Sequence, residues 1–309
     1  FTQVNVETVE VPGAPDQVDL LFTVAEKPTG SISLGAGFSS AEKVALSFGI
    51  RQENAFGSGN YLAVEVNTSK FNRNLVLSTT DPYFTKNGIS RTVDLFQRTT
   101  RPYLGDVDAY RLINSGAGLR FGVPVTETDT VFVGVNAEQT EIREGTGLPD
   151  AYRNYGEKFG TTSTALPLTL GWARDGRDSA LVPTRGSFQR VNADVSVGGD
   201  VRYVRASYQY QQYYPLSKKY TLAFNTDLGW GQGLKGQEYP LFKNFYVGGL
   251  GSVRGFEQST LGPSEPNSAT NPALIYLGGP KKLVFNTELI MPFPGAGNDR
   301  TLRLFGFTD

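Results

Sequence analysis

The sequence predicts an all-β protein, and more specifically a transmembrane antiparallel β-barrel. Apolar residues alternate with polar residues and glycine along most of the chain, whereas helical periodicity is almost absent. The alternating segments are long, roughly 10–14 residues, when an ordinary strand has about 5–6. They are joined by connections that are alternately short and long, a pattern typical of barrels in the outer membrane.

The alternation separates two faces in each segment. In residues 43–51, one face carries valine, leucine, phenylalanine and isoleucine, and the other carries lysine, alanine, serine, glycine and arginine. We expect the apolar face to contact lipid and the other face to line the lumen. Further apolar sets are Val131, Val133 and Val135; Leu166, Leu168 and Leu170; and Val191, Val195 and Val197.

The two longest connections favour a barrel over other all-β folds. They lie near residues 143–160 and 233–279, and they fall on the same side of the sheet if each strand reverses direction. A soluble β-sandwich or propeller also alternates and stays the alternative, although no blade repeat is visible in the sequence.

We expect about 13 barrel strands between residues 29 and 309. Bacterial single-chain barrels have an even number of strands, and an unpaired strand edge in lipid is very costly. We therefore expect further strands after residue 309. The expected strands are residues 29–40, 42–54, 59–70, 73–81, 89–101, 107–122, 129–142, 161–174, 186–199, 202–214, 219–231, 280–291 and 300–309.

The first 28 residues are predicted to be a separate unit. Two acidic strand-like stretches flank the turn sequence Pro-Gly-Ala-Pro at residues 12–15, and their alternation is weaker than in the rest of the chain. This pattern is typical of the last hairpin of a small α/β module. The predicted domains are residues 1–28, the end of such a module, and residues 29–309, a barrel that is incomplete at its C-terminal side.

The composition excludes several classes of function. The chain contains no Cys and no His, which removes thiol nucleophiles, imidazole bases and the usual zinc ligands. Its formal net charge of −1 provides no basic field for nucleic acid. We therefore expect no enzyme activity, no metal, no cofactor and no nucleic-acid partner.

Two groups of residues near strand ends are weaker candidates for a site. The cluster of Asp175, Arg177 and Asp178 could bind a cation or act in catalysis, but a polar turn held by charge pairs is favoured. Aromatic residues could form a binding platform, but in barrels an interfacial girdle is the commoner use. These aromatic residues are Tyr83, Phe84, Tyr103, Tyr213 and Tyr214.

The loop sequence GSVRGF contains the strongest candidate, Arg254. Guanidinium groups pair best with carboxylates where water is excluded, so a loop folded into the lumen needs an anionic partner there. The alternation in residues 283–289 turns Glu288 inward, and Asp309 is a second candidate. We predict that Arg254 contacts Glu288 inside the barrel, with Phe256 against the lumen wall. A solvated surface arginine is the alternative.

Several stretches resemble the BamA family of outer-membrane assembly factors. SVRGF at 252–256, preceded by FYVGG at 245–249, resembles that family's loop-six motif, here Val253, Arg254, Gly255 and Phe256. The resemblance covers essentially the whole chain. Its weaker parts are the turn sequences NAFGSGN at 54–60, DPYF at 81–84 and PTRGS at 183–187, and residues 11–27, which resemble the end of the last POTRA domain, a periplasmic polypeptide-binding module.

The resemblance implies a sixteen-stranded barrel behind POTRA domains, in a Gram-negative outer membrane with the N-terminus in the periplasm. It implies that the protein folds and inserts client barrels without ATP, through a lateral seam between the first and last strands. The implied partners are unfolded outer-membrane clients, periplasmic assembly lipoproteins, and outer-membrane lipid and lipopolysaccharide. The implied seam strand begins with Gly30, Ser31, Ile32, Ser33, Leu34 and Gly35, and its small inward-facing residues pack poorly.

Other barrels stay open as alternatives. A translocation barrel similar to TamA and a two-partner secretion transporter belong to the same superfamily, and the latter shares the VRG-type loop. DPYF and the short turns favour BamA over its sister barrel. A passive diffusion porin is the third alternative, but a porin would not need POTRA domains.

Overall fold

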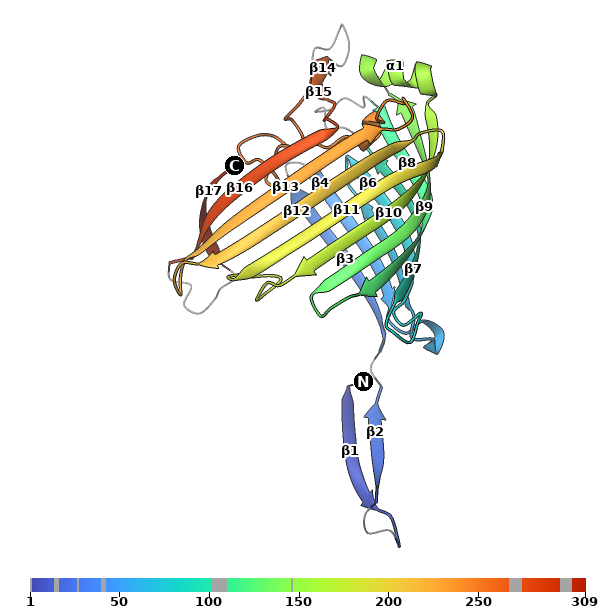
Figure 1. Ribbon diagram of the computed structural model, residues 1–309, viewed down its shortest axis with the longest axis vertical. Coiled ribbons are helices and arrows are strands. Elements are labelled where there is room, and N and C mark those ends of the chain that lie inside the picture. Colours follow the sequence, from blue (N-terminus) through green and yellow to red (C-terminus); the bar gives the residue numbers. More distant parts are fainter. Residues whose placement is uncertain are drawn as a thin grey trace.

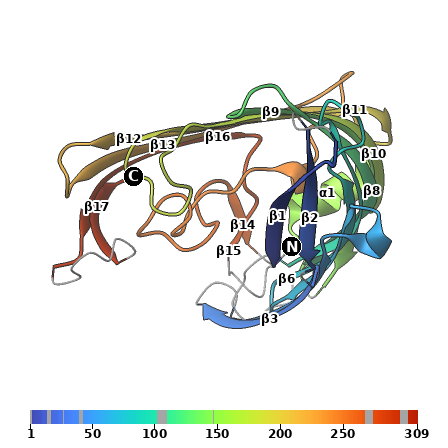
Figure 2. The same ribbon diagram turned by 90° about the horizontal axis from the view of Figure 1, so that it is seen from below.

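A computed structural model describes residues 2–13, 17–26, 28–39, 43–101, 110–145, 147–266, 274–294 and 302–309. Its main element is one antiparallel sheet of 13 strands that curves into a deep trough (Figures 1 and 2). Neighbouring strands follow the chain from β3 at one edge to β17 at the other, apart from the small β14–β15 hairpin. The predicted all-β antiparallel fold is therefore confirmed.

All the expected strands are present, with ends a few residues from the predicted ones. They are β3 (Gly30–Ser39), β4 (Lys43–Gln52), β5 (Tyr61–Thr68), β6 (Asn72–Asp81), β7 (Ser90–Thr100), β8 (Tyr110–Pro124), β9 (Asp129–Glu144), β10 (Thr162–Asp175), β11 (Gly186–Gly199), β12 (Tyr203–Pro215), β13 (Thr221–Gly233), β16 (Lys281–Pro292) and β17 (Arg303–Thr308).

The two faces of the sheet differ as the alternation predicts. On the outer face, Val133 of β9 pairs with Leu170 of β10, and these side chains are 49% and 56% exposed. On the inner face, glycines make room for larger side chains. A Cβ added to Gly116 would lie 2.8 Å from the ring of Phe96. The outer surface is therefore apolar, and the inner surface holds the polar and aromatic groups that contact the loops.

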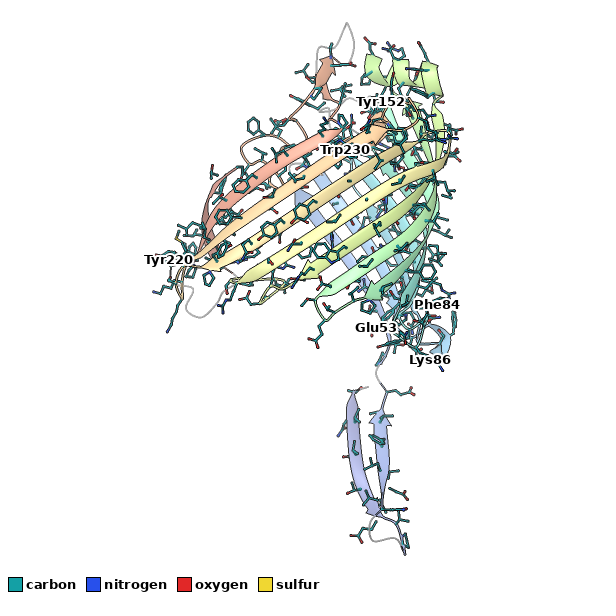
Figure 3. The ribbon with its side chains drawn as sticks, viewed as in Figure 1. Glu53, Phe84, Lys86, Tyr152, Tyr220 and Trp230 are labelled. Carbon is teal, nitrogen blue, oxygen red and sulfur yellow. The ribbon has the colours of Figure 1, made fainter. Side chains whose placement is uncertain are left out.

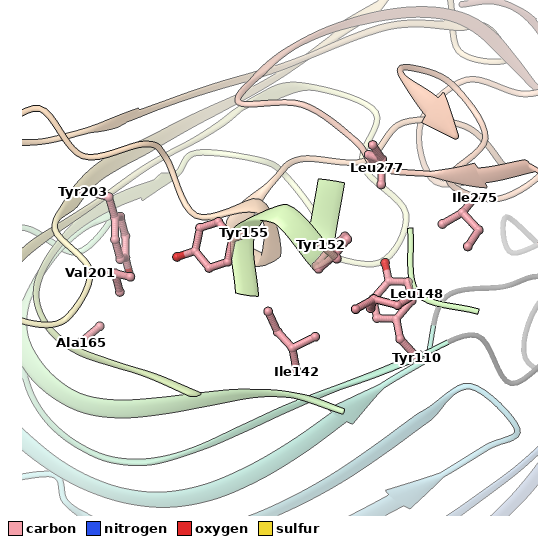
Figure 4. Close-up of a cluster of buried hydrophobic side chains, with 10 residues drawn as sticks. All are labelled: Tyr110, Ile142, Leu148, Tyr152, Tyr155, Ala165, Val201, Tyr203, Ile275 and Leu277. Carbon is pink, nitrogen blue, oxygen red and sulfur yellow. The ribbon is translucent and has the colours of Figure 1, made fainter. Parts of the chain in front are cut away.

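A ten-residue helix, α1 (Asp150–Phe159), lies between β9 and β10 and was not expected from the sequence. Tyr152, Tyr155 and Phe159 form one face of it, at helical spacing, and pack into a buried cluster at the end of the trough (Figure 4). Among the residues that the structure describes, no helix is long and apolar enough to cross a membrane. The cluster contains Tyr110, Ile142, Leu148, Tyr152, Tyr155, Ala165, Val201, Tyr203, Ile275 and Leu277.

The long connections gather at one end of the sheet, as predicted. Figure 1 shows α1 beside the small hairpin of β14 (Ser264–Pro266) and β15 (Leu274–Tyr276) at this end. The carboxylate of Glu265 in β14 accepts a hydrogen bond of 3.0 Å from the backbone N–H of Ala151 in the first turn of α1. The two connections therefore support each other, because this carboxylate satisfies an otherwise unpaired N–H at the positive end of the helix.

The N-terminal hairpin lies beyond the opposite end of the sheet (Figure 1). It consists of β1 (Gln3–Glu10) and β2 (Val18–Ala25), and every residue of both strands is exposed. Val4 pairs with Val24, and Val6 pairs with Phe22, so one face of the hairpin is apolar. The assignment of residues 1–28 to a separate module stays a prediction.

Candidate functional site

The connection between β13 and β16 passes through the inside of the curved sheet (Figure 2). It begins with a short 3₁₀ turn, η2 (Leu241–Lys243), and then pairs with itself. Phe245 and Gly279 exchange two backbone hydrogen bonds of 2.8 and 2.9 Å, and the N–H of Leu261 donates to the carbonyl of Val247 at 2.9 Å. These bonds give the loop an internal structure that carries its tip to the wall.

The tip of the loop needs its glycines. Gly248, Gly249 and Gly255 have φ values of 118°, 93° and 86°, which disfavour residues with a side chain. At Gly248 an added Cβ would also lie 2.5 Å from a backbone oxygen of the returning chain. The hydroxyl of Ser252 accepts the Gly248 N–H at 2.8 Å and closes the turn. The glycines noticed in the sequence therefore form the support that presents Arg254.

Arg254 binds two carboxylates on the wall. Its backbone N–H and its Nε donate to Oδ2 of Asp309 at 2.8 and 2.7 Å, and its Nη2 donates to Oδ1 of the same residue. Its Nη1 donates to Oε1 of Glu288 on β16. The structure thus brings the predicted partners together, with Asp309 as a bidentate partner and Glu288 as the second carboxylate.

Burial differs between the three charged groups. The side chain of Arg254 is 10% exposed and that of Asp309 is 3% exposed, whereas Glu288 retains 32%. The enclosed guanidinium is stable because two carboxylates, which accept three hydrogen bonds from it, compensate for the water that it loses. Removal of the arginine would leave Asp309 as a buried and unpaired charge.

Two aromatic residues of β17 complete the clamp and were missed by the sequence analysis. The guanidinium carbon of Arg254 lies 3.8 Å from the ring centre of Phe307 and 5.7 Å from that of Phe305. Phe305 and Phe307 lie on one face of β17, and Asp309, which directly follows the strand, continues the same alternation. The alternation of the sequence could have identified them. If Asp309 faces the inside of the sheet, Phe307 and Phe305 lie on the same inner face.

A second wall residue holds the loop backbone. Asn286 of β16 is 7% exposed, and its Nδ2 donates to the carbonyl of Ser252 at 2.6 Å. Its Oδ1 accepts a hydrogen bond of 2.9 Å from Asn225 of β13. Asn286 lies on the same inner face of β16 as Glu288, and the two residues bind the loop on either side of Val253.

The start of the loop, the root at Lys243, is attached to the sheet by separate contacts. Nζ of Lys243 lies 2.6 Å from Oε2 of Glu138 on β9, and the carbonyl of Lys243 accepts hydrogen bonds from Arg205 and Tyr239. Burial opposes the charge on Lys243, but Tyr203 and Glu138 outweigh it and raise the pKa of the ammonium group. The lysine therefore stays charged, and its ion pair with Glu138 attaches the loop to β9.

The other motif residues have different environments. Val253 accepts the N–H of Gly249 at 3.0 Å within the turn. Phe256 was expected against the lumen wall, but its side chain is 53% exposed. It lines a cavity of about 850 Å³ between the loop and β6–β9, which also contains Arg98 and Tyr276. Phe256 is thus half exposed and faces this cavity.

The predicted seam strand is remote from the clamp in the strand order. Among the described residues, β3 forms one edge of the sheet and pairs with β4 alone, whereas Arg254 binds at β16 and at the end of β17, near the other edge. Ile32 and Leu34 point outward and are 72% and 80% exposed. Ser33 donates a long hydrogen bond of 3.4 Å to Gly49. The remaining seam residues, Gly30, Ser31 and Gly35, also lie in β3, and a Cβ added at Gly30 or Gly35 would lie 2.5 Å from Gln52 or 2.3 Å from Ser47 of β4.

The alternative polar cluster forms a turn. Nε and Nη2 of Arg177 donate to the carboxylate of Asp175 at 2.9 and 2.7 Å. Asp178 accepts the backbone N–H groups of Thr184 and Arg185 at 2.9 and 3.1 Å. These contacts account for the charged groups as parts of the β10–β11 connection.

Similarity to known proteins shows the family to which the chain belongs. Residues 54–309 match the model of the Omp85 superfamily domain. The chain belongs to the Omp85 superfamily. Over 321 aligned residues it is 38% identical to the outer membrane protein assembly factor BamA of Neisseria meningitidis serogroup B, with 100% of the chain and 40% of that protein covered. It is 28% identical to BamA of Nitratidesulfovibrio vulgaris, with 95% of the chain and 36% of that protein covered.

The solved structures agree with this placement in the Omp85 superfamily. The crystal structure of BamA from Haemophilus ducreyi lacking POTRA domains 1–3 superimposes with a TM-score of 0.88 at 25% identity, covering 99% of the chain and 61% of that structure. The predicted membership of the BamA family is therefore confirmed. The chain spans about two fifths of the length of the curated BamA relatives that it matches. Their names place those relatives at the outer membrane, in agreement with the predicted location.

Proposed function

We propose that this chain is part of an outer-membrane assembly factor that folds client barrel proteins and inserts them into the membrane. The observation that carries the proposal is the match of the whole chain to BamA, in sequence and in fold. The SAM50-like protein of Schizosaccharomyces pombe, at 21% identity over 94% of the chain, indicates a more distant relationship to sorting and assembly components.

The outer surface supports a place in the membrane. Apolar side chains cover the outer face of the strands, and the exposed aromatic residues Tyr220, just before β13, and Trp230, near the other end of β13, mark the two ends of that face (Figure 3). Aromatic rings at both ends of an apolar face are typical of the two membrane interfaces. We place the end with the N-terminal hairpin in the periplasm and the end with α1 outside.

The N-terminal hairpin supports the POTRA assignment. Its apolar face, which contains Val4, Val6, Phe22 and Val24, has no cover within the described residues. A two-stranded hairpin alone is marginal in water, so helices of the same module are the expected cover. Such a module would receive unfolded clients and assembly lipoproteins before the barrel acts.

The work of the protein is non-covalent in this proposal. A client strand pairs with an exposed strand edge, and main-chain hydrogen bonds provide the affinity. The first strands are short, and a bilayer that thins to match them lowers the barrier to insertion. Small residues such as Ser31, Ser33 and Gly35 allow the edge at β3 to part from its neighbour. No reaction step requires a nucleophile, a metal or a nucleotide.

The clamp keeps the loop from moving during these steps. Arg254, Asp309 and Glu288 fix the tip on β16 and β17, and Lys243 fixes the root on β9. The loop therefore links β9 to β16 and β17, and it holds this side of the sheet in one shape while the short strands β3–β6 adapt.

The test is the folding rate of an unrelated small barrel protein in liposomes. The full-length protein is reconstituted, no nucleotide is added, and client folding is followed by its heat-resistant migration in gels. We expect folding to be faster than in liposomes with a reconstituted porin as the matched control. Solute conduction with unchanged client folding would favour a pore, either a porin or a secretion transporter, and would contradict the proposal.

A further inference from the structure

The turn between β4 and β5 exposes an aromatic side chain completely. Phe56 lies in the short 3₁₀ turn η1 (Ala55–Gly57) and has no cover from the described residues. Its φ of 55° and ψ of 28° are left-handed, a conformation in which glycine or asparagine is more stable than phenylalanine. Phe56 is therefore a large apolar residue that is fully exposed and has an unfavourable backbone conformation. This combination points to a contact with something outside the chain.

The turn is built to hold this residue in place. The side-chain oxygen of Asn54 accepts the N–H of Gly59 at 2.6 Å, and the hydroxyl of Ser58 donates to the carbonyl of Ala55 at 2.6 Å. Ala55 itself is buried. Phe56 therefore projects from a fixed frame, so its exposure is set by the fold of the turn.

The turn also sits at the root of the N-terminal hairpin. The N–H of Glu53 donates to the carbonyl of Thr29 at 2.8 Å, and Nε2 of Gln52 donates to the hydroxyl of Thr29 at 2.6 Å. η1, the short light-blue coil in Figures 1 and 2, projects outward from the wall at this end. Outward from the wall is the side on which lipid surrounds the barrel.

The neighbouring turn between β6 and β7 has a matching surface. Tyr83 is 79% exposed, and Lys86 is also exposed. Phe84 packs against Phe121 at 5.8 Å and beneath Arg91 at 4.3 Å. Figure 3 shows Phe84 and Lys86 near Glu53 at the same rim. Aromatic rings beside long basic side chains are typical of the boundary between lipid headgroups and acyl chains.

We propose that the turn of residues 54–60 is a lipid anchor at the periplasmic leaflet. Phe56 enters the boundary between headgroups and acyl chains, and Lys86 of the neighbouring turn binds lipid phosphate. Lipid is the occupant because the exposed apolar face of β4, with Leu46, Phe48 and Ile50, runs toward this turn. The anchor fixes the height of the hairpin root at Thr29 relative to the bilayer. This inference rests on the proposed outer-membrane location.

The experiment uses full-length protein in vesicles of phosphatidylethanolamine and phosphatidylglycerol. Since residues 1–309 contain no Cys, single cysteines at chosen positions can carry a nitroxide label in a form of the protein without other cysteines. Phe56→Cys is compared with Val133→Cys on the outer face of β9 and Asn154→Cys on the exposed side of α1. Electron paramagnetic resonance then measures the access of oxygen, which enters lipid, and of a polar nickel complex, which stays in water.

We expect the label at position 56 to show nickel access clearly below that at 154 but above that at 133, with oxygen still admitted, as at the boundary between headgroups and acyl chains. Nickel access equal to that at 154 would overturn the proposal, and exclusion of both reagents would overturn it by showing a protein cover. Water exposure at 133 as well would contradict the membrane location itself. As a second readout that retains an aromatic ring, Phe56→Trp should be quenched by brominated lipid, and an unquenched tryptophan would overturn the anchor.

Discussion

The wall formed by β3–β6 differs from the wall formed by β8–β13 in height and in packing. The four strands of the first wall have 8 to 10 residues each, and the six strands of the second have 13 to 16. At about 3.3 Å per residue, these strands reach about 26–33 Å and about 43–53 Å. A tilted strand needs about 9–11 residues to cross the hydrocarbon core, so only the long wall extends well beyond it.

The two walls also differ in packing, because the wall with the longer strands has more buried residues on its inner side. None of the described residues in β3–β6 is buried, whereas β8–β13 contain buried residues such as Tyr110, Ile142 and Tyr203. The long wall carries the root of the loop, through Glu138 and Arg205, and the packing beneath α1. We infer that the wall of long strands, β8–β13, is braced and keeps its shape. The wall of short strands, β3–β6, can deform beside the edge strand β3.

The largest expected effect comes from release of the loop tip. Arg254→Ala leaves the buried carboxylate of Asp309 without its partner, and we expect a loss of about 3–5 kcal/mol in the free energy of unfolding. Arg254→Lys should recover only part of it, because lysine lacks the bidentate fork. Unfolding in urea in the presence of lipid vesicles measures both variants.

The matched control is Arg153→Ala on α1, where the arginine and its partner Asp150 are 51% and 77% exposed. An exposed pair contributes about 0–1 kcal/mol. Equal stability of the Arg254 and Arg153 variants would show that the clamp at β16 and β17 does not stabilise the sheet.

The second-largest loss of stability is expected from a positive charge on the outer face of the braced wall. Val133→Arg on β9 places a cation against the acyl chains and should cost about 2–4 kcal/mol near the middle of the bilayer. Asn136→Arg, on the inner face of the same strand, should cost much less because the guanidinium remains in a polar lumen. Unfolding in lipid compares the two variants, and equal losses would reject the assignment of the outer face to lipid.

The anchor at the loop root should have a smaller effect. Lys243→Met leaves Glu138, whose side chain is 13% exposed, without its ammonium partner, and we expect a loss of about 1–3 kcal/mol. A second change, Glu138→Gln, should restore part of this stability because the unpaired charge is removed. A double-mutant cycle measures the coupling, and additive losses would mean that the loop root is held by its other contacts.

The contact between the two outer connections should have the smallest effect. Glu265→Gln removes the negative charge at the start of α1, and we expect a loss of about 0.3–1 kcal/mol that is confined to this helix. Amide hydrogen exchange in α1 should rise, with Glu257→Gln in the same loop as the matched control. Unchanged protection of Ala151 in the Glu265 variant would show that the packing of Tyr152 and Tyr155 alone holds the helix.

The sequence predicts the strands well because their signal is local. Alternation over ten or more residues identifies both the strand and its outer face, as in residues 131–135 and 166–170. Arg254 stood out because glycines framed it, and the fold indeed needs them at positions 248, 249 and 255.

Other features were missed because their signal is short or distant. α1 has ten residues and only three aromatic positions, too few for a clear helical period inside a loop. Lys243 and Glu138 are separated by 105 positions, and nothing local indicates that the loop folds back between them. Phe305 and Phe307 lie in a strand of six residues, where the alternation alone did not identify the inner face.

Hydrogen exchange of the full-length protein in lipid vesicles tests the contrast between the walls most directly. β4 and β5 are compared with β10 and β11, because each of these strands has a hydrogen-bonded neighbour on both sides. We predict that amides of β4 and β5 exchange much faster than those of β10 and β11, since few buried contacts oppose their opening. Equal protection of the two pairs would contradict the account of one yielding wall and one braced wall.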